Sequence, residues 1–85
     1  MGKENIIKKI IKSGKGLENI KEIFLSKTTF NHLFYSGNTY DGKHFIGIAT
    51  MNGIKRSFED DYNKIIEETG NYFKENGIRI EININ

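Results

Sequence analysis

The sequence predicts an α+β domain in which an antiparallel sheet packs against one long helix that precedes a C-terminal strand. Three successive segments indicate this fold class. An apolar run over 45–51 meets Asn52–Gly53 and a second strand-like run over 54–58, a pattern typical of a β-hairpin. A helix-period segment over 59–76 comes next, and isoleucines then alternate with polar residues over 78–84. We expect all 85 residues to form a single domain.

The N-terminal part predicts one helix or two. Isoleucines recur at i, i+4 spacing over 6–11 with lysines between them, and Ser13–Gly14 provide a stop signal. Apolar residues continue at helical spacing from Leu17 to about Leu25, which favours a second helix or a continuation past a kink. β-Branched and aromatic residues then indicate the first strand, over 31–35.

The remaining elements complete an antiparallel sheet of three strands plus the C-terminal strand. Turn residues at 36–38 and at Asp41–Gly42 are expected to bracket a loop that holds Tyr40. The long helix over 59–76 supplies one apolar face. The residues expected in the core are Phe45, Ile48, Ile65, Ile66 and Phe73.

The strand over 45–51 is apolar on both faces, so both faces of the sheet are expected to be covered. The long helix can cover one face. The N-terminal helices, or a second copy of the chain, would cover the other. The strand over 78–84 alternates cleanly and is expected to be a half-exposed edge that could accept a further strand. We therefore expect a homodimer or a subunit of a hetero-complex.

Composition excludes several classes of protein. The chain has no cysteine, so neither a disulfide framework, a cysteine-based zinc site nor a thiol nucleophile is available. No apolar run approaches the roughly 18 residues that span a bilayer, and the N-terminal isoleucines are interrupted by charges, unlike a signal peptide. We expect a soluble cytoplasmic protein with no membrane association.

Charge is distributed unevenly although the net charge is only +2. Residues 1–27 carry seven lysines against three glutamates, whereas residues 59–76 carry two lysines against six acidic residues. The pattern predicts a basic end and an acidic helix. Ile, Lys and Asn together make up 36 of the 85 residues, as an AT-rich coding sequence would produce, so part of the lysine content reflects composition.

Candidate catalytic chemistry is sparse. The two histidines are His32 and His44, and one arrangement would use His44 as a base, Asp41 to orient it and Ser36 as the nucleophile. The spacing is not diagnostic, and the chain lacks a nucleophile elbow, a histidine metal-ligand pair and a phosphate-binding loop. We expect a non-catalytic protein with no cofactor and no metal ion.

Two short motifs allow a structural and a functional interpretation. Gly14–Lys15–Gly16 before a helical stretch fits an ordinary turn, and it could also form an anion-binding nest of free backbone N–H groups. The acidic run over 59–61 stabilises the first turn of the long helix through the helix macrodipole. The same acids could mimic phosphates toward a basic partner. The structural interpretation is favoured in both cases.

The order of elements resembles two known families. From His32 to Ile80 the chain resembles the HicB antitoxin core, with Asp41–Gly42 before an aromatic-led strand, Gly53 opening the next strand and an acidic helix start at 59–61. The prolines typical of that family are absent. With the N-terminal helix added, the order also resembles a double-stranded-RNA-binding domain. That family begins its last helix with lysines, so the acidic start here argues against RNA binding in that mode.

These observations favour a small non-catalytic binding protein that occupies a macromolecular partner, more plausibly a protein than a nucleic acid. A phage- or plasmid-encoded inhibitor of a host enzyme or defence system, or an antitoxin, would fit. Aromatic anchors and acidic residues are the expected contacts. The candidates are Tyr35, Tyr40, Glu59, Asp60, Asp61 and Tyr62.

The alternative function is binding of nucleic acid or nucleotide, through the basic N-terminus and an aromatic sheet face. Cations interleaved with aromatic side chains are what single strands need. The candidate cations are Lys8, Lys12, Lys15, Lys43, Lys55 and Arg56. The acidic helix would oppose this function, because it would repel phosphates.

Overall fold

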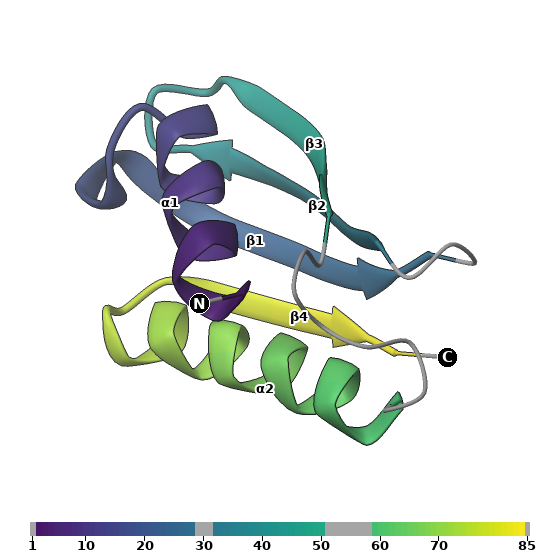
Figure 1. The fold of residues 1–85 in the computed structure, drawn as a ribbon. Coiled ribbons are helices and arrows are strands. Elements are labelled where there is room, and N and C mark those ends of the chain that lie inside the picture. Colours follow the sequence, from purple (N-terminus) through teal and green to yellow (C-terminus); the bar gives the residue numbers. More distant parts are fainter. Residues whose placement is uncertain (1, 29–31, 51–58, 85) are drawn as a thin grey trace.

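The fold is α+β, as the sequence predicts, and the described residues form two helices and a four-stranded mixed sheet (Figure 1). The computed structural model describes residues 2–28, 32–50 and 59–84, and the side chains among them from residue 6 and, in the last range, from residue 63. The elements in chain order are α1 (Gly2–Ser13), a short 3₁₀ helix (Leu17–Asn19), β1 (Ile20–Lys27), β2 (His32–Thr39), β3 (His44–Thr50), α2 (Glu59–Glu75) and β4 (Arg79–Asn83).

The strand order in the sheet is β3-β2-β1-β4. β1, β2 and β3 form an antiparallel meander, whereas β4 pairs with β1 in parallel. A parallel neighbour requires a crossover connection, and α2 is the helix in the connection that passes from β3 across two strands to β4 (Figure 1). The sequence therefore predicts the final helix and strand correctly, including the half-exposed alternation of β4 and its position at a sheet edge.

Both helices lie on the same face of the sheet, which we call the covered face (Figure 1). α2 lies along β4 and β1, and α1 contacts α2 at one side and β3 at the other. Alternate strand residues point to this face and form the core with the apolar sides of the helices. The buried apolar residues are Ile6, Ile7, Ile10, Ile20, Ile23, Leu25, Leu33, Tyr35, Phe45, Ala49, Ile66, Phe73 and Ile78.

The predicted second helix that reached Leu25 is wrong, because residues 20–27 form β1. Ile20 and Ile23 are both almost fully buried although they lie three residues apart, a spacing that imitates a helix. The cause is a register shift against β2 between Ile20 and Glu22, which inserts one residue into the period of two. The register shift therefore gives the buried residues of this strand the spacing expected of a helix.

The predicted turn at 36–38 is also wrong, because these residues lie inside β2. Gly37 is required there for packing: the aromatic ring of Phe45, its partner on β3, and a carbonyl of β1 occupy the space that a Cβ atom would need. Tyr35 covers its own partner, Gly47, in the same way. Each glycine thus accommodates an aromatic ring from the neighbouring strand.

Four of the five predicted core residues lie in the core or against it. Ile66 and Phe73 are fully buried, Phe45 is buried, and Ile65 packs against the core in a partly buried position. Ile48 is wrong, because 52% of its surface is exposed on the opposite face of the sheet. The expectation that the N-terminal helices would cover the second face is therefore wrong within the described residues, and cover by a second copy stays a prediction. The predicted turn at 52–53 and strand at 54–58 lie outside them.

Replacement of Ile66 by alanine tests the core. Because the side chain is 0% exposed, we expect Ile66→Ala to lower the free energy of unfolding by about 2–5 kcal/mol, measured by urea denaturation. The matched control is Ile46→Ala, which truncates a side chain that is 60% exposed and should change stability by less than about 0.5 kcal/mol. Equal losses in the two variants would contradict the assignment of faces.

Candidate functional site

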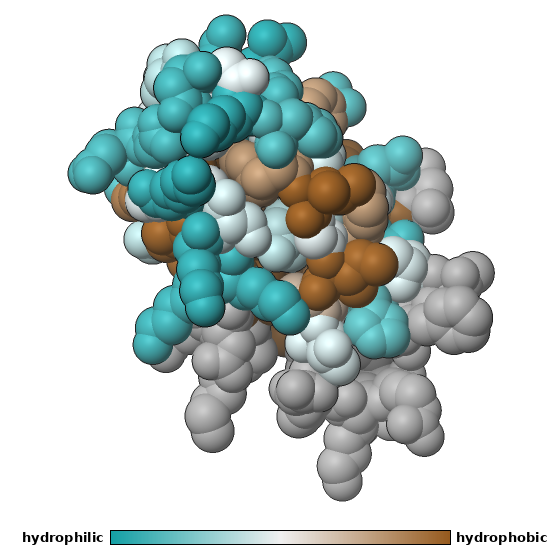
Figure 2. Space-filling model, turned by 90° about the horizontal axis from the view of Figure 1, so that it is seen from above, coloured by the Kyte–Doolittle hydropathy of each residue, from teal (hydrophilic) through white to brown (hydrophobic). Residues whose placement is uncertain are grey.

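The face of the sheet opposite the helices, the open face, carries an apolar patch. We define the open-face patch by four residues on three strands: Phe24, Phe34, Ile46 and Ile48. Phe34 lies directly opposite Ile48, and Ser36 lies between Phe24 and Ile46. Ile46 is 60% exposed, Ile48 52% and Phe24 39%, so these side chains contribute little to the core. Figure 2, which looks onto the β3 side, shows hydrophobic side chains gathered among hydrophilic ones.

A hydrogen-bonded polar row borders one end of the patch. The Asn38 amide Nδ2 donates to a carboxylate oxygen of Glu22 at 2.7 Å, and the Asn38 Oδ1 lies 3.2 Å from Nδ1 of His44. The three residues come from β1, β2 and β3 and follow the strand register. His44 therefore lies opposite Asn38, two residues along β2 from Ser36. The row gives the apolar patch a polar rim, as protein interfaces commonly have.

The structure does not assemble the candidate catalytic group of His44, Asp41 and Ser36. The ring of His44 contacts Asn38, whereas Asp41 accepts hydrogen bonds from Thr39 and from the backbone of Lys43. Ser36 pairs with Ile46 inside the sheet. These residues belong to separate networks, so no nucleophile–base–carboxylate relay exists among them.

The loop around Tyr40 is a tight turn between β2 and β3, as the sequence predicts. The N–H of Gly42 donates to the Thr39 carbonyl at 3.1 Å, and the N–H of Thr39 donates to the Lys43 carbonyl at 2.8 Å. Gly42 has φ 86°, a left-handed conformation that glycine adopts without steric cost. The hydroxyl of buried Thr39 donates to Asp41, and this hydrogen bond, with smaller contributions from Lys43, lowers the pKa of the exposed Asp41 carboxyl.

The structure separates the residues expected to contact a partner. Tyr35 is excluded from that role, because it is 2% exposed and its hydroxyl lies 2.9 Å from Ser13 Oγ under α1. Tyr40 is 66% exposed at the β2–β3 turn. The predicted contacts at 59–62 belong to the start of α2, at the opposite end of the sheet (Figure 1), and their side chains lie outside the described part of the chain. Tyr40 and the acidic helix start therefore do not form one surface.

Of the candidate nucleic-acid contacts whose side chains are described, only Lys43 lies near an exposed aromatic residue, Tyr40 in the same β2–β3 turn. Lys8 and Lys12 are exposed on α1, Lys15 follows that helix, and Lys43 lies in the β2–β3 turn. α1 packs on the covered face, whereas the exposed phenylalanine side chain of β1 lies on the open face. Of the aromatic residues on or beside β2 and β3, Tyr35 and Phe45 are buried and Tyr40 is exposed. Lys55 and Arg56 lie outside the described residues.

The glycine-flanked Lys15 forms a helix end and not an anion-binding nest. The N–H groups of Gly14 and Gly16 donate to carbonyls of α1 at 3.0 and 2.9 Å, and the N–H of Lys15 donates to another at 3.2 Å. Lys15 has φ 61°, the left-handed geometry that commonly terminates helices. Since all three donors are used within the chain, none is available to an anion.

Sequence reasoning missed Phe24 and Phe34 as surface residues. The register shift gives the segment around Phe24 a helical spacing, which hides its place in a strand. The strand predicted over 31–35 does not show which face of the sheet Phe34 occupies. The signal that could have found them is the alternation of side chains along paired strands. Once β1 and β2 are aligned, both phenylalanines lie opposite serines, on the opposite face of the sheet from Leu25 and Tyr35. The alignment depends on how the two strands pair in the folded protein, so it cannot be derived from the spacing of apolar residues within one segment.

The described residues carry no group of three or more histidine, aspartate or glutamate side chains that could hold a metal ion. Within the same residues, neither helix is long and apolar enough to cross a membrane. Searches against protein-family models, curated proteins and solved structures find no significant match to this chain.

The Asp41 hydrogen bond predicts a pH-dependent contribution to stability. Its carboxyl pKa lies below the ordinary 3.8, so the ionised group favours the folded state above that pH, and the contribution disappears as the pH falls through the lowered pKa. We expect Asp41→Asn to lower Tm near neutral pH and to have no effect below the lowered pKa. Thr39→Val is the control, because it removes the hydroxyl donor and should abolish the pH dependence of the Asp41 effect. A Tm loss independent of pH would contradict this explanation.

Proposed function

We propose that this chain is a small non-catalytic binding protein that acts by occupying a protein partner through the open-face patch. The observation that carries the proposal is the exposure of Ile46, Ile48 and Phe24 on one sheet face that no described helix covers. Burial of such side chains stabilises a complex through the hydrophobic effect, and the polar row of Glu22, Asn38 and His44 provides a rim. These side chains are not part of the buried core, so core packing does not explain why apolar residues occupy these exposed positions.

The charges near the patch favour a protein over a nucleic acid. Glu22, Glu81 and Arg79 share the open face, so the local charge is mixed and not basic. Phosphate backbones require concentrated positive charge, and the lysines of α1 lie on the other side of the sheet. An apolar surface with a mixed polar rim resembles a typical protein–protein interface.

The kind of partner is proposed from the composition of the chain. A chain rich in Ile, Lys and Asn, as an AT-rich coding sequence would produce, and without a recognised catalytic motif in its sequence fits an inhibitor of a host enzyme or defence system, or an antitoxin, encoded by a phage or plasmid. The resemblance of the element order to the HicB antitoxin core supports the same proposal. Such a protein would act in the cytoplasm as a homodimer or as a subunit of a hetero-complex.

The patch can be tested by placing charge on it. We expect the wild type, immobilised and exposed to nuclease-treated host lysate, to retain a protein partner, and Ile46→Lys/Ile48→Lys to lose at least tenfold in affinity for it. Both side chains are exposed, so circular dichroism should show an intact fold. The control Lys8→Glu/Lys12→Glu alters charge on α1 and should retain the partner. Unchanged retention by the patch variant would contradict the proposal.

The second candidate function is nucleic-acid binding, which the aromatic residues of the open face, exposed Phe24 and half-buried Phe34, favour. Phe24 and Phe34 lie on adjacent strands, an arrangement on which bases of a single strand could stack. Binding of this kind would survive protease treatment of the lysate and disappear after nuclease treatment. It would also weaken steeply with salt.

Reversal of charge at the start of α2, a helix that packs on the covered face, tests whether the acidic residues expected from the sequence contribute to binding. We expect Asp60→Lys/Asp61→Lys to weaken binding to a basic protein partner, with a larger effect at low ionic strength, because screening is then weaker. The same variant should strengthen binding to a nucleic acid, since it removes repulsion of the phosphates. Titration against the retained partner at two salt concentrations measures the sign. No change in either direction would exclude the start of α2 from the binding site.

A further inference from the structure

The outer edge of β4 is open within the described part of the chain. β4 is the last strand in the order β3-β2-β1-β4, and its described neighbour is β1 alone. Its side chains alternate: Ile80 and Ile82 point to the covered face, while Arg79 and Glu81 point to the open face. Over residues 79–82 the outer edge of β4 has no neighbouring strand among the described residues, and an edge strand of this kind can accept another strand.

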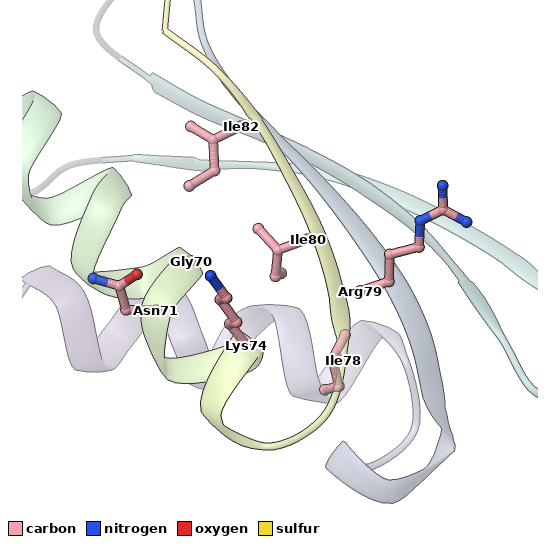
Figure 3. A pocket seen from close by; sticks show the side chains of 7 residues that line it. All are labelled: Gly70, Asn71, Lys74, Ile78, Arg79, Ile80 and Ile82. Atoms are coloured by element: carbon pink, nitrogen blue, oxygen red, sulfur yellow. The ribbon is translucent and has the colours of Figure 1, made fainter.

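A groove runs beside this edge between β4 and α2 (Figure 3). Ile78, Ile80 and Ile82 form its apolar side, and Gly70, Asn71 and Lys74 of α2 form the other. Gly70 lies against Ile82, where a Cβ atom would collide with the isoleucine side chain. Ile80 and Ile82 are only partly buried, so they retain apolar surface for a further contact.

We infer that β4 pairs in antiparallel orientation with β4 of a second copy of this chain, with Ile80 of each copy on the two-fold axis. In this register Arg79 lies opposite Glu81 of the other copy, and Glu81 lies opposite Arg79, so two pairs of opposite charge form on the open face. On the covered face, Ile78 lies opposite Ile82 and Ile80 opposite Ile80. The two four-stranded sheets then join into one.

The other registers are less favourable on charge alone. A shift of two residues in one direction places Glu81 opposite Glu81, and the shift in the other direction places Arg79 opposite Arg79; like charges directly across a sheet are destabilising. A shift of one residue places isoleucines opposite charged residues and turns one copy over. The Ile80-centred register is therefore the one in which both faces of β4 are self-complementary.

The strand that pairs with β4 is β4 of a second copy and not an unrelated strand, because the charged and apolar residues of β4 complement those of another β4. Both Arg79 and Glu81 are exposed; within the chain Arg79 lies opposite Glu22 of β1, and Glu81 lies opposite the uncharged Phe24. The isoleucines of the second copy would also cover the apolar side of the groove. This inference does not rest on the proposed function, since it uses the sheet edge and not the open-face patch.

Charge reversal with rescue tests the register. Wild-type protein should sediment as a dimer of the 9.8 kDa chain, and Arg79→Glu should raise the dimer Kd on the order of tenfold, because it sets Glu opposite Glu twice. Glu81→Arg should do the same by setting Arg opposite Arg. The double variant Arg79→Glu/Glu81→Arg restores opposite charges in reversed order and should return the Kd to within a few fold of the wild type. Arg79→Glu also sets Glu opposite Glu22 of β1 within the chain, so circular dichroism checks the fold of each variant, and Glu81→Arg, whose partner within the chain is the uncharged Phe24, reports the contact between copies alone.

Single cysteines test the position of the axis, since the chain has no native thiol. Ile80→Cys places two thiols directly opposite each other and should give a covalent dimer with a short thiol cross-linker. Ile82→Cys is the control: its thiol faces residue 78 of the other copy, about 13 Å along the strand from the second thiol. A monomer at all concentrations, absence of rescue, or preferential cross-linking through Ile82→Cys would each overturn the inference.

Discussion

The placement of both helices on a single face of the sheet is the constraint on which the rest of this structure depends. α1 and α2 contact each other and together cover the face that carries Leu25, Tyr35 and Phe45. A chain of this length has no further described helix for the other face. Among the described residues, three of the four apolar side chains of the open-face patch are therefore exposed to water, and a partner that buried the patch would be favoured by the hydrophobic effect.

Close packing on the covered face depends on pairs of aromatic and glycine residues. Tyr35 lies over Gly47 and Phe45 over Gly37, so large rings fill the space between the sheet and α1 without separating the strands. The two rings are also near each other, with centroids 6.5 Å apart. Tyr35 extends this layer to the end of α1 through Ser13. Burial of a tyrosine is compatible with the core here because its hydroxyl has a polar neighbour.

The parts of the fold that could be predicted are those in which local periodicity is uninterrupted. The amphipathic pattern of α2 and the alternation of β4 each run through a whole element, and Asp41–Gly42 mark a turn by local chemistry. β1 could not be recognised, because the register shift after Ile20 gave its buried residues a helical spacing. The candidate site depended on that strand. Without β1, neither the exposure of Phe24 nor the burial of Tyr35 could be derived from the pattern.

The parallel pairing of β1 with β4 has a consequence for the order of folding. β1, β2 and β3 are joined by short connections, so their pairing closes only small loops, whereas Ile23 meets Ile80 after most of the chain has intervened. The entropy of closing a long loop grows with its length, and such contacts form late and slowly. The meander should therefore assemble first, and the docking of β4 should complete the sheet. Until then one side of β1 is unpaired, and this intermediate is the species most exposed to misassociation.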